Sequence, residues 1–78
     1  MSFFKVGKYE VRAWAFGSSG PNGRRMNGHW SVTDPSNPDE PVADGACSTE
    51  REGDGAAIND ALTAGREAAE ALIAKDGA

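Results

Sequence analysis

The sequence is poor in the large aliphatic and aromatic residues that usually fill the core of a small protein. Of its 78 residues, 30 are hydrophobic and 13 of those 30 are alanine, whereas valine, isoleucine, leucine and phenylalanine together number only 11. The fraction of valine, isoleucine, leucine and phenylalanine therefore lies below the roughly 20% at which chains begin to look disordered, but disorder also requires a high net charge. Because the net charge is only −4, we expect one small folded domain, residues 1–78, with a thin core.

Cysteine and histidine each occur once, as Cys47 and His29. A single cysteine excludes an internal disulfide framework and is typical of a reducing compartment. Together the two residues cannot supply the four ligands of a tetrahedral zinc site. We therefore expect no metal and no cofactor. A chain this short buries only about 60–65% of its unfolded surface, so a protein partner is the remaining source of added stability.

Long apolar runs are missing as well. No segment approaches the ~18 apolar residues of a membrane span. The first eight residues, MSFFKVGK, lack the apolar stretch of a secretory signal peptide. These observations predict a cytoplasmic protein that does not contact a membrane.

The charges are divided unevenly along the chain. Five basic residues against one acidic residue give residues 1–33 a net charge of +4, whereas three against eleven give residues 34–78 a net charge of −8. An acidic balance disfavours a general nucleic-acid binder, because affinity there comes mainly from neutralising phosphates. It leaves room for a local basic patch in the first half.

Two segments of the first half alternate as the strands of a half-buried sheet do. In residues 8–16 (KYEVRAWAF) and 26–33 (MNGHWSVT), apolar or small residues occur at every second position, with β-branched and aromatic residues among them. Between them, residues 17–25 (GSSGPNGRR) predict a long, mobile hairpin loop, in which Asn22-Gly23 suits a type I′ turn. Residues 1–7 are expected to be flexible or to form a short lead-in strand.

The second half begins with a rigid acidic turn and ends in a helix. Residues 34–41 (DPSNPDEP) contain three prolines and predict a loop. Residues 42–49 predict a weaker third strand at the sheet edge, with a bulge at Asp44-Gly45. From residue 56 to residue 75 the apolar period changes to that of an amphipathic helix. The expected apolar face of this helix consists of Ile58, Ala61, Leu62, Gly65, Ala68, Ala69, Leu72 and Ile73.

The order of elements predicts an α+β fold. Its simplest closed form is a two-layer sandwich, a three-stranded antiparallel β-meander with one C-terminal amphipathic helix on one face (β-β-β-α). The face expected to meet the helix carries Tyr9, Val11, Ala13, Ala15, Trp30 and Val32. Gly65 costs about 1 kcal/mol in mid-helix relative to alanine, so we expect it to allow close approach to Trp30 or Tyr9.

The opposite face is expected to carry Arg12, Trp14, Phe16 and His29. Two aromatic residues at positions i and i+2, beside arginine and histidine, form an apolar patch. Aromatic residues and arginine are also enriched among the residues that dominate protein interfaces. We interpret this patch as a surface for a protein partner or a homodimer. Two alternatives stay open: Phe3 and Phe4 fold back over the rings, or the two sheet faces are exchanged.

Several catalytic and ligand-binding interpretations fail on spacing. Pairing across the proline-rich turn places His29 opposite Ala46, so Cys47 points to the other side and a Cys-His dyad is excluded. The acidic residues of DPSNPDEPVADG lack the spacing of a calcium loop. Gly53-Asp54-Gly55 lacks the lysine and hydroxyl residue of a phosphate-binding loop. We therefore predict that the protein is not an enzyme and has no small-molecule substrate.

Arg24 and Arg25 lie in the expected hairpin loop and are candidates for contact with an anion. Together with Arg12 and Trp14 they are compatible with weak binding of a nucleic acid, in which aromatic rings stack on bases and cations follow the backbone. A simpler interpretation is that the two arginines keep the loop soluble and bind no anion.

Three short motifs carry a resemblance. Tyr9-x-Val11-x-Ala13, Gly28-x-Trp30-x-Val32 and Ala61-x-x-x-Gly65-x-x-Ala68 resemble segments of small β-β-β-α hypothetical proteins of proteobacteria and their phages. The resemblance implies the fold and no activity. A further hypothesis is an inhibitor encoded by a phage or mobile element, similar in role to an anti-CRISPR protein. Its acidic second half, Asp34 through Glu70, then blocks or mimics a nucleic-acid surface on a host enzyme.

Overall fold

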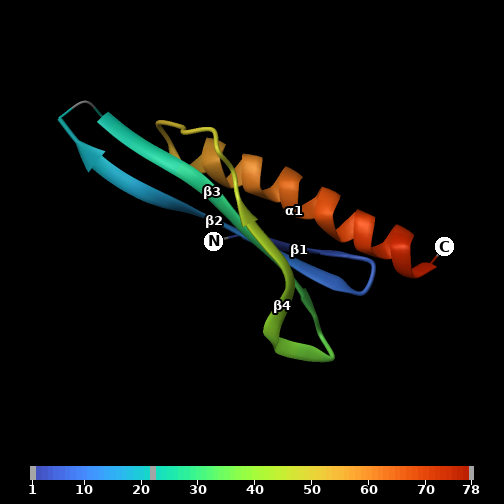
Figure 1. The fold of residues 1–78 in the computed structure, drawn as a ribbon. Helices are drawn as coiled ribbons and strands as arrows, with labels where there is room; N and C mark the ends of the chain where they lie inside the picture. The colour runs from blue at the N-terminus through green and yellow to red at the C-terminus, as the bar shows by residue number, and fades with distance from the viewer. Residues whose placement is uncertain (1, 22, 78) are drawn as a thin grey trace.

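A four-stranded antiparallel sheet and one long helix form the two layers of the protein (Figure 1). The computed structural model describes residues 2–21 and 23–77, with overall dimensions of 49 × 23 × 15 Å. The strands lie in the sheet in the order β1-β2-β3-β4. The elements are β1 (Ser2–Val6), β2 (Tyr9–Gly20), β3 (Gly23–Asp34), β4 (Asn37–Ala46) and α1 (Asp54–Gly77).

The α+β class and the C-terminal helix are confirmed, but the sheet has four strands where three were predicted. The additional strand is β1, which pairs antiparallel with Tyr9–Ala13 of β2. Gly7, with a φ of 59°, lies in the turn between them. Phe4 and Val6 pack against the core. The segment is so short that its alternation alone did not separate a strand from a flexible lead-in.

The hairpin joining β2 and β3 has a much shorter loop than predicted. The two strands pair continuously from Glu10↔Thr33 to Gly20↔Gly23, so most of residues 17–25 is strand. Glycine and serine have low strand propensity, but the hydrogen-bonded ladder with the opposite strand holds them extended. The predicted Asn22-Gly23 turn includes Asn22, which lies outside the described residues, while Gly23 has a φ of 102°.

The expected loop at residues 34–41 is also mostly strand, because the chain turns at Pro35 and Ser36 and β4 begins at Asn37. Prolines are tolerated in β4 because it is an edge strand. The sheet irregularity lies beside Thr33, which pairs with Pro41, and the predicted bulge at Asp44-Gly45 is wrong. Gly45 instead makes room for an indole, since a Cβ there would lie 2.7 Å from Cζ2 of Trp30.

The core lies between α1 and one face of the sheet. Its fully or nearly fully buried side chains are Tyr9, Val11, Ala13, Val32, Ala57, Ala61 and Ala69. This confirms the predicted inner face. Four helix residues spaced four apart, Ala57, Ala61, Gly65 and Ala69, are all buried and all small. Residues with this spacing share one side of a helix, so α1 meets the sheet along a smooth stripe.

Two glycines mark the closest approach of helix and sheet. A Cβ on Gly28 of β3 would lie 2.2 Å from the main-chain oxygen of Ala57. A Cβ on Gly65 of α1 would lie 2.5 Å from Cγ1 of Val11 and 3.4 Å from Cβ of Trp30. The predicted approach of Gly65 to Trp30 is therefore confirmed, with Val11 nearer still.

The helix is longer than the predicted range of 56–75 by two residues at each end. Ile58, Leu62 and Leu72 are half-buried at the sides of the small-residue stripe, whereas Ile73 lies largely outside it. Within residues 2–21 and 23–77, no helix is both long enough and apolar enough to cross a membrane.

Candidate protein-binding surface

Three aromatic rings lie together on the sheet face opposite α1. Trp14 of β2 and His29 of β3 are directly paired, and Phe16 follows two residues later on β2. The rings of Trp14 and His29 stack with their centroids 6.0 Å apart and their planes 14° from parallel. Phe16 meets His29 edge-to-face at 5.8 Å. We call Trp14, Phe16 and His29 the ring cluster.

The position of the ring cluster follows from the alternation of β2. Val11 and Ala13 are completely buried beneath α1, so Trp14 and Phe16, in the opposite phase, point to the other face. The exchange of faces considered above is therefore wrong. The sequence predicted that these residues share a face. It did not predict that His29 makes ring contacts with both Trp14 and Phe16.

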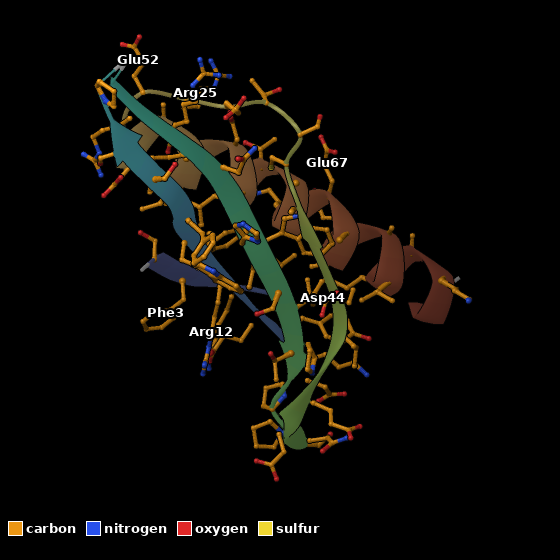
Figure 2. All side chains as sticks on the ribbon, turned by 60° about the vertical axis from the view of Figure 1, so that its left-hand side comes forward. Phe3, Arg12, Arg25, Asp44, Glu52 and Glu67 are labelled. Atoms are coloured by element: carbon orange, nitrogen blue, oxygen red, sulfur yellow. The ribbon has the colours of Figure 1, made fainter. Side chains whose placement is uncertain are left out.

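Among the described residues, no other aromatic ring stacks on the cluster. Phe3 pairs with Arg12 and is itself 67% exposed on the open face, whereas Phe4 points toward the helix, where the guanidinium of Arg66 lies 5.1 Å from its ring centroid. Phe16 is 69% exposed. Phe3 and Arg12 point to the same side of the sheet (Figure 2). Phe3 was missed as a surface residue because the sequence left open whether residues 1–7 are flexible or form a short lead-in strand, and so did not orient its side chain.

Arg12 lies two residues before Trp14 on β2, on the same face of the sheet as the ring cluster. Its Nε donates a hydrogen bond of 2.8 Å to Oε1 of Glu10, two residues earlier on the same face. Ser31 of β3 and Phe3 of β1 are its cross-strand neighbours. About half of the Arg12 side chain is exposed, so the guanidinium is held in place while part of it faces solvent.

Two shallow hollows lie on either side of His29. One, of about 520 Å³, is lined by Phe16, Arg25 and Asn27 together with the chain that follows β4. The other, of about 530 Å³, is lined by Trp14 and Asp44 among others. Both include His29 and Ala46. The imidazole of His29 is therefore part of the lining of both hollows.

The wall of the first hollow is tied to β3. The side-chain amide of Asn27 donates to the main-chain oxygens of Cys47, at 2.9 Å, and Thr49, at 3.4 Å. Met26 and Arg51 exchange two main-chain hydrogen bonds of 2.8 Å. These bonds hold the segment after β4 against the sheet, which gives the hollow a fixed border.

Arg24 and Arg25, the predicted anion contacts, lie on β3 near the hairpin tip and each faces a carboxylate. Arg24 donates to Asp54 at the start of α1, and Nη1 of Arg25 lies 3.6 Å from Oε1 of Glu50. The structure does not bring them to the ring cluster as a group, although Arg25 borders the first hollow. Their charge is largely offset where they lie.

Ion pairs join the basic first half of the chain to the acidic second half. Besides Arg24 and Arg25, Lys8 pairs with Asp34. Within the second half, Arg51 makes two bonds to Asp60, which raises the pKa of its guanidinium. Among the described residues, no ion pair involves the carboxylates of Asp39, Glu40, Asp44, Glu52, Glu67 and Glu70.

Cys47 and His29 lie on opposite sides of the sheet. His29 pairs with Ala46, as predicted, and the next residue, Cys47, is half-buried. Burial, and to a smaller extent the nearby charge of Asp60, raise the pKa of the Cys47 thiol. The described parts of the chain contain no group of three or more His, Cys, Asp or Glu residues able to hold a metal ion.

Comparison of the chain with protein-family models, with curated proteins and with solved structures finds no match.

Proposed function

We propose that the protein acts without catalysis, by binding another protein through the open face of its sheet. The observation that carries this proposal is the ring cluster, which is stacked in a fixed arrangement on the face that α1 does not cover. Exposed aromatic groups of this kind are uncommon on a monomer and mark interaction sites.

The chemistry of the surface favours a polypeptide as the partner. Aromatic and arginine side chains contribute most of the binding free energy in protein interfaces, and Arg12 lies beside Trp14 with half of its surface free. Trp14 and His29 are half-buried and already ordered by stacking. Less conformational entropy is therefore lost when a partner covers them.

The nucleic-acid hypothesis is less well supported. Binding to a phosphate backbone needs cations that are free to replace counterions. Arg12, Arg24 and Arg25 are each paired with a carboxylate. Binding to labelled single-stranded DNA or RNA at about 50 mM salt tests this hypothesis, and a steep loss of affinity with added salt supports it.

One observation favours the inhibitor hypothesis as a second candidate. Among the described residues, carboxylates without an ion pair are spread over β4 and the exposed side of α1, and Figure 2 labels Asp44 and Glu67, which lie on these two elements. A surface of this charge complements a basic, nucleic-acid-binding protein. If this hypothesis holds, a Glu67→Gln, Glu70→Gln variant weakens capture of a basic partner, and added salt weakens capture by the wild type.

Affinity capture followed by mass spectrometry, and then by reconstitution with the purified partner, tests the main proposal. Trp14→Ala and Arg12→Ala are expected to lose the partner that the wild type retains. Val42→Ala is the matched control, because Val42 is an exposed apolar residue outside the ring cluster. Equal retention by the wild type, Trp14→Ala and Arg12→Ala contradicts the proposal.

A further inference from the structure

One of the two hollows beside His29 carries charge of one sign. This hollow, of about 530 Å³, is lined by Trp14 of β2 and Asp44 of β4, and the other described residues of its lining all belong to β3 and β4. β3 lies between the strands that carry Trp14 and Asp44. Among the described lining residues only Asp44 has a formal charge, since His29 is counted as neutral at pH 7. We call this space the Asp44 hollow.

The side chain of Asp44 lies on the outer face of the sheet, as the ring cluster does. Its neighbour Ala43 pairs with the completely buried Val32, so Asp44, in the opposite phase, lies on the face away from α1. In the part of the chain that the structure describes, no ion pair involves Asp44. Arg12 lies on the same face but pairs with Glu10, and Figure 2 shows it on the other side of β3. The Asp44 carboxylate is therefore available to a cation from another molecule.

The hollow on the other side of His29 differs in charge. Its lining includes Arg25 and Glu50, whose Nη1 and Oε1 atoms are 3.6 Å apart, so the two charges largely offset each other. Charge therefore gives that hollow no preference between a cation and an anion. The unpaired carboxylate of Asp44 gives the Asp44 hollow a preference for a cation, because complementary charge determines which groups an interface accepts.

We propose that the Asp44 hollow receives a lysine or arginine side chain of the protein partner. The inference rests on the proposed function, because it names the side chain that the partner places beside the ring cluster. Lysine and arginine combine an apolar stem with a charged end. The stem packs against Trp14 and His29, and the charged end pairs with Asp44. A cation close to an aromatic face is also attracted by the ring itself.

The geometry favours a long basic side chain over a small cation. Neighbouring strands lie about 4.8 Å apart, so the main chains at Trp14 and Asp44 are separated by roughly 10 Å across β3. His29 and Ser31 of β3, both half-buried, line the hollow between them. A small cation at Asp44 leaves the rings uncovered. A lysine or arginine that lies across β3 contacts the carboxylate and the rings together.

A carboxylate on an edge strand also has a simpler role, because charges keep such strands from pairing with other chains. Asp39 has the same charge on the same strand, is exposed like Asp44, and does not line the hollow. Asp39→Asn therefore reproduces the loss of one negative charge from β4, whereas Asp44→Asn also removes the carboxylate from the hollow. The two variants are matched, and only Asp44→Asn is expected to weaken binding of a basic side chain.

Titration of the full chain with a blocked glycine-arginine-glycine tripeptide, followed by two-dimensional NMR, tests the inference. The indole N–H of Trp14 and the main-chain amides of Ser31 and Ala46 are expected to shift with one common affinity. Asp44→Asn should weaken that affinity about threefold, and Asp39→Asn should leave it unchanged. The uncharged glycine-glutamine-glycine tripeptide should bind the wild type more weakly than the arginine tripeptide. Equal affinities of the two tripeptides, or equal losses in the two variants, overturn the inference.

The inference and the proposed function fail in different ways. A purified partner that Trp14→Ala no longer binds, but that Asp44→Asn binds as tightly as the wild type does, overturns the inference and leaves the proposed function standing. Tripeptide binding that depends on Asp44, in a protein whose partner is retained equally by the wild type, Trp14→Ala and Arg12→Ala, supports a site for basic side chains and contradicts the proposed function.

Discussion

The two faces of the sheet are built differently, although their residues alternate along the same strands. The inner face meets a helix stripe of alanine and glycine so closely that main chains approach each other at Gly28. The outer face carries the rings of Trp14 and Phe16 with no helix over them. The shortage of large residues in the sequence is therefore a shortage in the core. Several of the bulkiest side chains, among them Phe3 and Phe16, instead lie exposed on the outer face.

The largest expected effect is at Gly28, where the inner face allows no side chain at all. A Cβ there meets the main-chain oxygen of Ala57 at 2.2 Å and Cβ of Ala61 at 2.9 Å, so Gly28→Ala must push the helix away. We expect a loss of about 3 kcal/mol in the free energy of unfolding, measured by urea denaturation. Gly20→Ala, a strand glycine with open space around it, should change little. Similar losses in both variants would show that the helix does not need this contact.

A smaller effect with an unusual sign is expected at Gly65. Glycine to alanine in a helix interior normally stabilises by about 1 kcal/mol. Here the new Cβ would lie 2.5 Å from Cγ1 of the fully buried Val11, so we expect Gly65→Ala to destabilise by roughly 1–2 kcal/mol. Gly55→Ala is the control on the same helix, because nothing lies within 4 Å of its Cβ position. A stabilised Gly65→Ala variant would contradict the close packing of this face.

The inner face could be predicted from the sequence because its signals are local. Alternation in β2 and β3 and the change to a helical period near residue 56 defined both layers. The strand boundaries could not be predicted at Gly17–Gly20 or Asn37–Pro41, because glycine, serine and proline there are held extended by pairing with the adjacent strand of the hairpin, against their own low strand preference. The ring cluster was predicted as a set of residues. The contacts of the His29 ring, stacked on Trp14 and edge-to-face with Phe16, depend on cross-strand register, which local patterns do not define.

On the outer face we expect a substitution to weaken partner binding without much effect on the free energy of unfolding. Phe16 is 69% exposed, so Phe16→Ser should lower the free energy of unfolding by less than about 1 kcal/mol while it weakens partner binding. Val11→Ala, in the same strand but fully buried, should cost about 2 kcal/mol. Thermal or urea denaturation, together with capture of the partner, measures both properties. A Phe16→Ser variant as unstable as Val11→Ala would mean that the ring cluster belongs to the core.

Ion pairs at the surface should contribute less to the free energy of unfolding than the apolar contacts of the inner face. Arg51 bonds to both carboxylate oxygens of Asp60, at 2.8 and 3.2 Å, but the pair is partly exposed to solvent. A double-mutant cycle with Arg51→Gln and Asp60→Asn is expected to give a small coupling free energy, which decreases with added salt. A larger, salt-independent coupling would show that this pair holds the loop before α1 as firmly as the apolar contacts hold the helix.

The two faces should also differ in the reactivity of a thiol. Burial, and secondly the charge of Asp60, raise the pKa of Cys47. Since the thiolate is the reactive form, alkylation of Cys47 should reach its half-maximal rate at a higher pH than alkylation of an unburied thiol. An Ala46→Cys, Cys47→Ser variant moves the thiol to the exposed neighbouring position on the outer face and should react faster at neutral pH. Because burial is the larger cause of the raised pKa, Asp60→Asn should lower the pKa of Cys47 only part of the way toward that of an unburied thiol. Identical pH profiles for the two thiols would mean that the helix side of β4 is as open to water as the outer side.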